Sequence, residues 1–237
     1  MQTTKQSTFR TLAYADLGLI EYAEAWRLQK ILHEKRRRDE INDTLLLLEH
    51  PHTYTLGKVA DTANILADEE FLNEHDISVF EIDRGGDVTY HGPGQIVGYA
   101  IINLAEWKKD THEYLRALEQ TVINTCEELG VSAGRNPEYT GVWVGENKIC
   151  AIGVKVSRWI TMHGFAFNVN PELKFFESII PCGIKGKGVT SLKKETAKEY
   201  SLNEIKIALV KNFIRVFSYS EKKNFSDFVT NLISKKE

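Results

Sequence analysis

Cys182 is the residue of this chain best placed to act as a nucleophile. It stands between Pro181 and Gly183, in a turn that proline fixes on one side and glycine leaves uncrowded on the other. Lys185 and Lys187 follow closely, and positive charge near a thiol stabilises the reactive thiolate. The pattern favours covalent catalysis, but spacing alone leaves a structural turn cysteine as an equal alternative.

The other two cysteines are typical of packing positions. Cys126 falls on the apolar face of an expected helix, and Cys150 lies in an apolar strand beside Ala151. Three scattered cysteines without a C-x-x-C motif exclude a disulfide scaffold and a zinc site of the common type. A reducing cytosol fits this usage.

A second concentration of reactive side chains runs from Arg84 to Gln95, with the sequence Arg-Gly-Gly-Asp-Val-Thr-Tyr-His-Gly-Pro-Gly-Gln. Arg84 supplies a fixed charge and forked donors, and His91 can donate or accept a hydrogen bond near neutral pH. Strand-like apolar runs flank the stretch, so we expect its glycines to sit inside a sheet, where glycine marks a close approach of a ligand or of another backbone. We predict a binding site with a glycine floor; the alternative is a glycine-rich hairpin with incidental polar residues.

Two further polar groups have simpler explanations. His50 and His52 flank Pro51 without a third ligand nearby, so we expect hydrogen-bonded or exposed histidines rather than a metal site. The run Arg36-Arg37-Arg38 ends an expected helix, where basic residues favour the negative end of the dipole and a solvated face is the expected role.

Hydrophobic periodicity predicts the elements that position these residues. Capping boxes, Asp110-x-x-Glu113 and Ser201-x-x-Glu204, predict two helix starts. Gly153 and Gly164 fall inside two strands and indicate either bare backbone for a ligand or a bulge. Strands are expected at 9–14, 44–49, 53–56, 77–83, 96–104, 141–144, 148–156 and 161–169, the last three as antiparallel hairpins; helices are expected at 19–40, 68–75, 110–130 and 201–216, with a short polar helix finishing the chain.

The length and composition of the chain limit its domain number and the partners it can have. At 237 residues, with 42% hydrophobic and 27% charged residues, the chain suits one globular domain. A formal charge of −3 argues against a general nucleic-acid binder. We expect no membrane span, because no apolar run approaches about 20 residues. The N-terminus lacks a secretory signal, and its ten acid-free residues are too short to predict a transit peptide.

Several motifs in order and at consistent spacing resemble the lipoyl(octanoyl) transferases over residues 12–217. They are the stretch from Arg84 to Gln95, Lys148-Ile-Cys-Ala-Ile-Gly, His163-Gly-Phe-Ala-Phe-Asn and Pro181-Cys-Gly-Ile, with Glu49-His-Pro, Tyr54-Thr-Leu-Gly and Gly188-Val-Thr-Ser-Leu in support. The resemblance implies the α/β fold of biotin and lipoate ligase catalytic domains, with a large mixed sheet, a smaller sheet and flanking helices. We expect residues 1–237 to form a single catalytic domain.

The resemblance also implies an activity. Members of the family transfer an octanoyl group from the phosphopantetheine of acyl carrier protein to a lysine of the lipoyl domains of 2-oxoacid dehydrogenases and of the glycine cleavage H protein. Neither ATP nor a metal is expected as a cofactor. Nucleic acid and membrane are not expected partners, and we expect a cytoplasmic monomer.

The same resemblance assigns roles by position. Cys182 matches the acyl-thioester cysteine, and Lys148 matches the lysine that lowers the thiol pKa and shuttles the proton. Without the resemblance, Lys148 would be a solvated turn lysine after Asn147. Cys150 and Asp87 depart from the family's usual residues, away from these groups. The implied substrate contacts are Arg84, Gly85, Gly86, Asp87, Val88, Thr89, Tyr90, His91, Ala151, Ile152, Gly153, Gly164, Phe165 and Ala166.

Three other functions stay open at this point. An amidotransferase moving lipoyl or octanoyl groups between carrier domains would use the same cysteine chemistry. An ATP-dependent lipoate or biotin ligase would share the scaffold but has no need of Cys182 paired with Lys148. A non-catalytic binding module for acyl carrier protein or lipoyl domains would have no reason to keep Cys182, Lys148 and His91 together.

Overall fold

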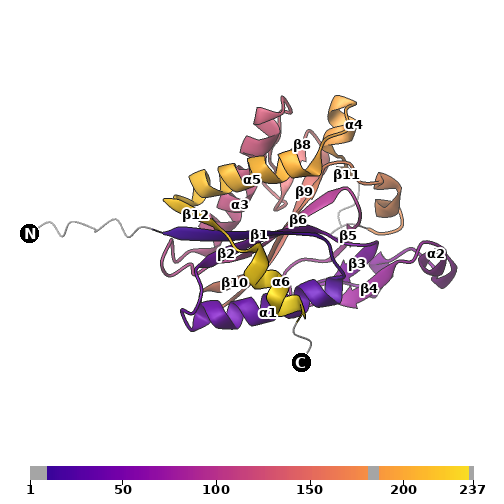
Figure 1. Cartoon of the computed structure of the whole chain (residues 1–237). Helices are drawn as coiled ribbons and strands as arrows, with labels where there is room; N and C mark the ends of the chain where they lie inside the picture. Colours follow the sequence, from indigo (N-terminus) through magenta and orange to yellow (C-terminus); the bar gives the residue numbers. More distant parts are fainter. Residues whose placement is uncertain (1–9, 181–186, 235–237) are drawn as a thin grey trace, which may run out of the picture.

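The computed structural model describes residues 10–180 and 187–234, and within them two sheets carry the fold (Figure 1). The larger sheet has the strand order β12-β1-β2-β6-β10-β9-β8-β7, with β11 pairing beside β9. The smaller sheet has the order β4-β3-β5. The strands are β1 (Thr11–Leu19), β2 (Asp43–Glu49), β3 (Thr53–Leu56), β4 (Ser78–Glu81), β5 (Val88–His91), β6 (Gln95–Ile101), β7 (Gly134–Arg135), β8 (Val142–Val144), β9 (Asn147–Ser157), β10 (Ile160–Asn168), β11 (Gly188–Val189) and β12 (Glu221–Asn224).

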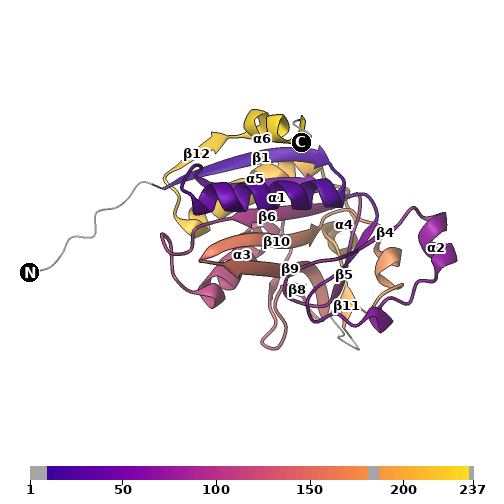
Figure 2. The same cartoon turned by 90° about the horizontal axis from the view of Figure 1, so that it is seen from below.

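Helices cover both faces of the large sheet, as Figures 1 and 2 show from two directions. On one face, α3 and α5 bury apolar side chains against β2, β6, β9 and β10. On the other face, α1 and α6 do the same. The helices are α1 (Tyr22–Arg37), α2 (Glu69–Glu74), α3 (Thr111–Glu128), α4 (Leu192–Thr196), α5 (Leu202–Phe217) and α6 (Ser226–Ser234), with 3-10 turns at Thr62–Asn64 and Leu173–Phe176.

Mixed strand direction confirms the expected α/β class. β1 is parallel to β2 and β12, whereas β2, β6, β10, β9, β8 and β7 alternate in direction. The hairpins expected between residues 141 and 169 are present as β8, β9 and β10. The small sheet has its own core, in which Tyr54, Val88 and Tyr90 pack against Phe175 and Phe176.

Several local expectations are confirmed by the structure and others are wrong. The Asp110 side chain accepts hydrogen bonds from the N–H groups of His112 and Glu113, as its capping box predicts. Ser201 precedes α5 but makes no side-chain cap bond. The residues from Leu19 to Glu21 are not helical: β1 extends to Leu19 and α1 begins at Tyr22.

The C-terminal elements also differ from expectation. The last helix, α6, is amphipathic rather than polar, because Val229 is buried and Phe228 packs against the α1 face. Strand β12 was not predicted, since Glu221-Lys-Lys-Asn224 carries no apolar side chain.

The arginine run is only partly solvated. Arg37 and Arg38 form surface ion pairs with Glu34, but the Arg36 side chain is 4% exposed and binds Asp43. The expected solvated face is therefore wrong at Arg36, which anchors the C-terminal end of α1 to the sheet.

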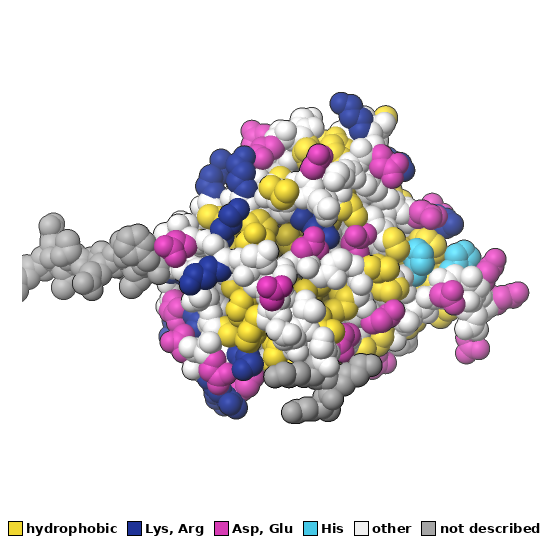
Figure 3. All heavy atoms as spheres, in the orientation of Figure 1, with side chains coloured by type: hydrophobic (Ala, Val, Ile, Leu, Met, Phe, Trp, Pro, Cys, Tyr) yellow, Lys and Arg dark blue, Asp and Glu magenta, His cyan; other side chains and the backbone are white. Residues whose placement is uncertain are grey.

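Charge is dispersed over the surface. Figure 3 shows basic and acidic side chains interspersed with apolar ones on the face that carries α5, β1 and α6. Among the described residues, no helix combines the length and apolarity needed to cross a bilayer.

Candidate active site

The stretch from Arg84 to Gln95 links the small sheet to the large one. Residues 84–87 form a loop, β5 belongs to the small sheet, and β6 begins at Gln95 in the large sheet. The Gln95 N–H donates to the Gly92 carbonyl at 3.1 Å, which closes the Gly-Pro-Gly turn. The first glycines therefore lie in a loop, and the prediction that they sit inside a sheet is wrong for Gly85 and Gly86.

Arg84 is buried and holds this loop against the small sheet. Its guanidinium donates to the carbonyl oxygen of Thr55 at 2.7 Å and to its hydroxyl at 2.9 Å. It also donates to the Gly85 carbonyl at 3.1 Å. The fixed positive charge predicted from sequence is present and is oriented by these contacts.

His91 is buried and neutral. Burial, with help from the neighbouring His50, lowers the pKa of His91 to about 3. Because the Gln95 amide nitrogen donates to the Tyr90 carbonyl, its oxygen faces His91 Nδ1–H as an acceptor at 2.8 Å. The expectation that His91 can donate or accept a hydrogen bond near neutral pH is confirmed, because its Nδ1–H donates to Gln95.

A chain of hydrogen bonds through two side-chain amides runs from His91 toward Lys148. Gln95 Nε2 donates to Asn168 Oδ1 at 3.0 Å, and Asn168 Nδ2 donates to the Thr190 carbonyl at 3.0 Å. The Thr190 N–H in turn donates to the Lys148 carbonyl at 3.0 Å. Gln95 and Asn168 belong to the motifs found in the sequence, but no role was predicted for them. An amide side chain within an otherwise apolar strand is the sequence signal that could have indicated one.

The strand glycines serve close packing of the protein itself. A Cβ on Gly164 would lie 2.1 Å from the Gly98 carbonyl oxygen, and a Cβ on Gly153 would lie 2.9 Å from the Gly85 oxygen and the Arg84 side chain. Strand pairing is regular at both glycines, so the bulge expected as the alternative to bare backbone for a ligand is not present at either position. Both glycines nevertheless line the cavity described next.

A cavity with about 460 Å³ of atom-free space, part of it open to solvent, lies where the loop, β6, β9 and β10 meet. Its middle wall is apolar, with Val97, Ala151 and Ala166. Ten of the predicted substrate contacts line it: Arg84, Gly86, Thr89, His91, Ala151, Ile152, Gly153, Gly164, Phe165 and Ala166.

Four predicted contacts do not line this cavity. Val88 and Tyr90 point into the core of the small sheet, because alternate residues of a strand face opposite sides. Asp87 binds the Asn64 amide at 2.7 Å, and Gly85 pairs with the backbone of Val154. The structure therefore places these four residues away from the cavity lining.

Lys148 is buried beside a smaller hollow of about 290 Å³ of atom-free space. Its side chain is only 8% exposed, and Nζ lies 4.8 Å from the centre of the Trp143 ring. The two hollows share Thr89, Ala151 and Ala166 as lining residues. The solvated turn lysine expected without the family resemblance is therefore wrong, and Lys148 adjoins the apolar cavity.

Cys182 lies outside the described residues. The described cysteines, Cys126 and Cys150, are buried and unreactive, since burial raises the pKa of Cys126 to about 12 and raises that of Cys150 further from its usual range. Their expected packing roles are confirmed.

The end of the cavity away from Lys148 carries residues that sequence reasoning missed. Tyr22, Tyr99 and His163 line it. The centroids of the Tyr99 and His163 rings lie 6.3 Å apart. No local sequence signal reveals this wall, because its residues come from α1, β6 and β10.

Asp83 ties the glycine loop to this wall. It contacts Lys155 Nζ at 2.5 Å and His163 Nε2 at 2.8 Å. Partial burial alone would raise the pKa of Asp83, but the hydrogen bonds from Lys155 and His163 lower it to about 2. The loop is therefore pinned across β9 and β10 at neutral pH.

His50 and His52 take part in hydrogen bonds. His50 Nδ1 lies 2.7 Å from the Ile20 carbonyl, which can only accept, so Nε2 accepts from the Tyr99 hydroxyl at 2.8 Å. His52 Nδ1 lies 2.7 Å from the Tyr90 hydroxyl. In the described ranges, no group of three His, Cys, Asp or Glu side chains is arranged to hold a metal ion.

Comparison with known proteins gives consistent matches. Residues 21–214 match the family described as the lipoyl protein ligase A/B catalytic domain. The octanoyltransferase of Rubrobacter xylanophilus is 54% identical over 201 residues, which cover 84% of this chain and 90% of that protein. The octanoyltransferase of Solibacter usitatus is 48% identical over 210 residues, covering 89% and 94%.

Solved structures share the fold at low sequence identity. A lipoate-protein ligase A bound with ATP superposes with a TM-score of 0.70 at 14% identity, covering 97% of this chain and 96% of that one. The putative lipoate protein ligase Ta0514 of T. acidophilum with bound lipoic acid gives 0.69 at 15% identity, covering 96% and 93%.

Proposed function

The chain belongs to the lipoyl protein ligase A/B catalytic-domain family and is an acyltransferase, and from that membership we propose that residues 1–237 form one catalytic domain that transfers octanoyl groups. The donor is octanoyl-acyl carrier protein, and the acceptor is a lysine of a lipoyl domain or of the glycine cleavage H protein. Neither a nucleotide nor a metal takes part.

The first step forms an acyl-enzyme on Cys182. The Cys182 thiolate attacks the carbonyl carbon of the donor thioester, a new C–S bond forms, and the bond to phosphopantetheine breaks. The departing thiolate takes a proton from the Lys148 ammonium, which becomes a neutral amine able to accept a proton in the second step. One thioester replaces another, so the step is nearly balanced in free energy and needs no ATP.

The second step passes the acyl group to the acceptor. A deprotonated lysine amine attacks the Cys182 thioester, the C–N bond forms, and the Cys182 thiolate leaves. Lys148 accepts the proton that the amine loses, and in the resting enzyme its cation favours the thiolate. Backbone N–H groups stabilise the oxyanion of each tetrahedral intermediate.

The observation that carries this proposal is the placement of Lys148. It adjoins a cavity with an apolar middle, and β11, a few residues beyond Cys182 in the chain, pairs with β9 at Lys148. A buried cation beside a cavity with an apolar middle wall suits thioester chemistry at its mouth. The octanoyltransferase names of the two relatives agree with this chemistry.

The test is formation of the acyl-enzyme. Purified protein is incubated with octanoyl-acyl carrier protein without ATP, and the intact mass is measured before and after addition of a lipoyl domain. We expect one octanoyl adduct that disappears as the domain gains the acyl group, and no adduct on Cys182→Ser. A strict requirement for ATP would instead favour a ligase, and faster transfer from octanoylated H protein would favour an amidotransferase.

A further inference from the structure

Strand β9 carries a bulge beside the smaller hollow. Val142 of β8 lies opposite Cys150. The next residue, Trp143, lies opposite Lys148, so Ile149 has no counterpart in β8. At the same point β9 changes its neighbour on the other side: Lys148 pairs with β11, and from Cys150 onward the pairing is with β10. Bulges are common next to active sites, where they re-aim a side chain.

This bulge changes the face to which the Lys148 side chain points. Ile149 and Cys150 are consecutive, yet both are fully buried in the core that contains α3. Regular alternation along a strand would put Lys148 and Cys150 on the same face. With the extra residue, Lys148 shares the opposite face with Ala151, and both line the smaller hollow. The bulge therefore places the Lys148 amine at the hollow instead of in the apolar core.

Trp143 faces Lys148 across the two strands. It is 3% exposed, and Lys148 Nζ lies 4.8 Å from the centre of its ring. The indole N–H donates to the Tyr139 carbonyl at 3.2 Å, which helps to fix the plane of the ring. An ammonium at this distance is attracted by the face of the ring, most strongly where water is excluded. The ring therefore holds the end of a flexible four-carbon side chain.

Gly141 and Glu119 fix the backbone beside the stem of the same lysine. Gly141 has a φ of +132°, which glycine adopts without strain, and a Cβ there would lie 3.4 Å from Lys148 Cε. The Gly141 N–H donates at 3.1 Å to Oε1 of Glu119, a fully buried carboxylate on α3. Oε2 of Glu119 is bound by Arg116 at 2.7 Å and by Arg135 at 3.0 Å. Helix α3 is thus connected to the position of Lys148.

We propose that Trp143 is a positioning residue for the transfer reaction, which holds the Lys148 amine at the hollow before substrate arrives. This inference rests on the proposed function, in which Lys148 exchanges protons with the reacting groups. Trp143 lines neither hollow, so it acts through Lys148. Transfer should be sensitive to this placement, because a displacement of about 1 Å can cost about 10²-fold in rate.

Nuclear magnetic resonance tests the placement independently of activity. In protein labelled with carbon-13 lysine, the side-chain signals of Lys148, assigned with Lys148→Met, should be displaced by the ring current of Trp143. Trp143→Phe keeps an aromatic face and should keep a displacement of the same sign. Trp143→Leu should move these signals toward those of an exposed lysine such as Lys198.

Single-turnover rates test the effect on the reaction, at a temperature where thermal denaturation shows every variant folded. Trp143→Leu should lower transfer from the acyl-enzyme to the lipoyl domain about ten-fold or more, because a misplaced amine slows chemistry. The half-saturating concentration of the domain should change less than about two-fold, because ground-state binding is intact. Trp143→Phe should stay within about three-fold of the wild-type rate.

Trp107→Leu is the matched control. Trp107 also packs against the core of α3 and has a lysine over its ring, Lys108 at 5.3 Å, but it lines neither hollow. This variant should lose stability as Trp143→Leu does and keep the wild-type rate of transfer.

The outcomes separate the two proposals. Lys148 signals without a ring-current displacement in the wild-type protein, or wild-type transfer by Trp143→Leu, would overturn the positioning role. Equal losses of rate in Trp143→Leu and in either Trp143→Phe or Trp107→Leu would also overturn it, because general loss of packing would then explain them. Displaced signals in a protein that forms no acyl-enzyme would support the placement of Lys148 by Trp143 and refute the proposed transfer.

Discussion

At the scale of single residues, the site keeps its histidines neutral by burial. His91 belongs to the stretch from Arg84 to Gln95, and the His50 ring lies 5.7 Å from it; burial lowers the pKa of His50 to about 4 and that of His91 to about 3. Each then has one donor and one acceptor nitrogen, which orients Tyr99 and Gln95. These histidines support the wall and the chain of amide hydrogen bonds rather than exchange protons at neutral pH.

This neutrality predicts a pH dependence of stability. The pKa of His50 is about 4 in the folded protein and 6.5 when unfolded, so the unfolded state binds the proton first. Its contribution is complete above pH 6.5 and falls by about 1.4 kcal/mol per pH unit down to pH 4. His50→Gln should flatten the fall in the free energy of unfolding by that slope, as measured by urea denaturation from pH 7.5 to 4.5.

The matched control for this measurement is His112→Gln, because the His112 side chain is 94% exposed. It should leave the slope unchanged. An unchanged slope in His50→Gln would show that His50 is not held neutral in the folded protein.

Lys148 gives a second prediction at this scale. If it is the proton acceptor, Lys148→Met should lower acyl transfer to the lipoyl domain by about 10²- to 10⁴-fold, since general base catalysis contributes that much. Lys198→Met, on the exposed surface after α4, should leave the rate unchanged. The rates come from single-turnover assays, and equal rates for both variants would exclude a role for Lys148 in proton transfer.

At the scale of elements, β6 and β10 are held at a separation that only glycine permits. Gly164→Ala would bring a Cβ to 2.1 Å from the Gly98 carbonyl oxygen, and both groups belong to the backbone. We expect a loss of about 1–3 kcal/mol or more in the free energy of unfolding, together with weaker octanoate binding. Thermal and urea denaturation measure the first effect and calorimetry the second.

Gly134→Ala is the control for this substitution. No atom lies within 4 Å of the Cβ position at Gly134, and its φ is not in the left-handed region. Stability should change by less than about 0.5 kcal/mol. Equal effects at both positions would mean that β6 and β10 can separate without cost.

The elements also show what the sequence could predict. Apolar runs and turn residues were enough to predict β2, β3, β6 and the hairpins of β8, β9 and β10, because burial on both faces leaves a strong local pattern. Strand β12 left none, since its four residues are polar and exposed. The motifs predicted the cavity residues on β9 and β10, but Tyr22 and Tyr99 meet only through tertiary packing.

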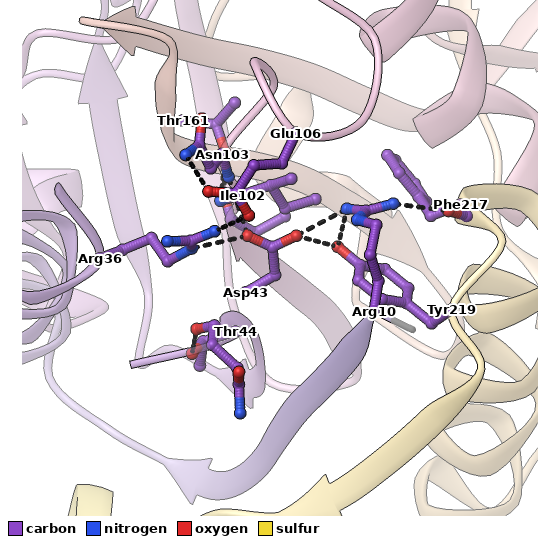
Figure 4. Close-up of polar contacts among 12 residues, drawn as sticks. Arg10, Arg36, Asp43, Thr44, Ile102, Asn103, Glu106, Thr161, Phe217 and Tyr219 are labelled. Atoms are coloured by element: carbon purple, nitrogen blue, oxygen red, sulfur yellow. Dashed lines mark hydrogen bonds and ion pairs between the residues drawn. The ribbon is translucent and has the colours of Figure 1, made fainter. Parts of the chain in front are cut away.

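At the scale of the whole molecule, one carboxylate joins four segments (Figure 4). Asp43, at the start of β2, accepts from Arg36 of α1 at 2.9 Å and from Arg10 before β1 at 2.7 Å. It also accepts from the Tyr219 hydroxyl at 2.8 Å and from the Asn103 N–H at 2.9 Å. Asp43 and Arg36 are both 4% exposed, so the ion pair is shielded from water.

Removing this carboxylate should destabilise the entire fold. Asp43→Ala leaves the buried Arg36 charge without its partner in β2, and we expect a loss of about 3–5 kcal/mol in the free energy of unfolding. Glu34→Ala removes the partner of the exposed Arg37 and Arg38 and should cost less than about 1 kcal/mol. Urea denaturation at pH 7 compares them, and similar losses would mean that the Asp43 cluster adds no special stability.

The pairing of β12 with β1 has a consequence for biosynthesis. Thr11 lies opposite Glu221, so the outer side of β1 stays unpaired while the ribosome makes nearly all of the intervening chain. An unpaired strand is a template for intermolecular association. In the finished protein β12 covers this edge of β1, and its Lys222 and Lys223 carry positive charge at the new edge of the sheet. A nascent chain halted before residue 221 should therefore depend on chaperones in a way that the finished protein does not.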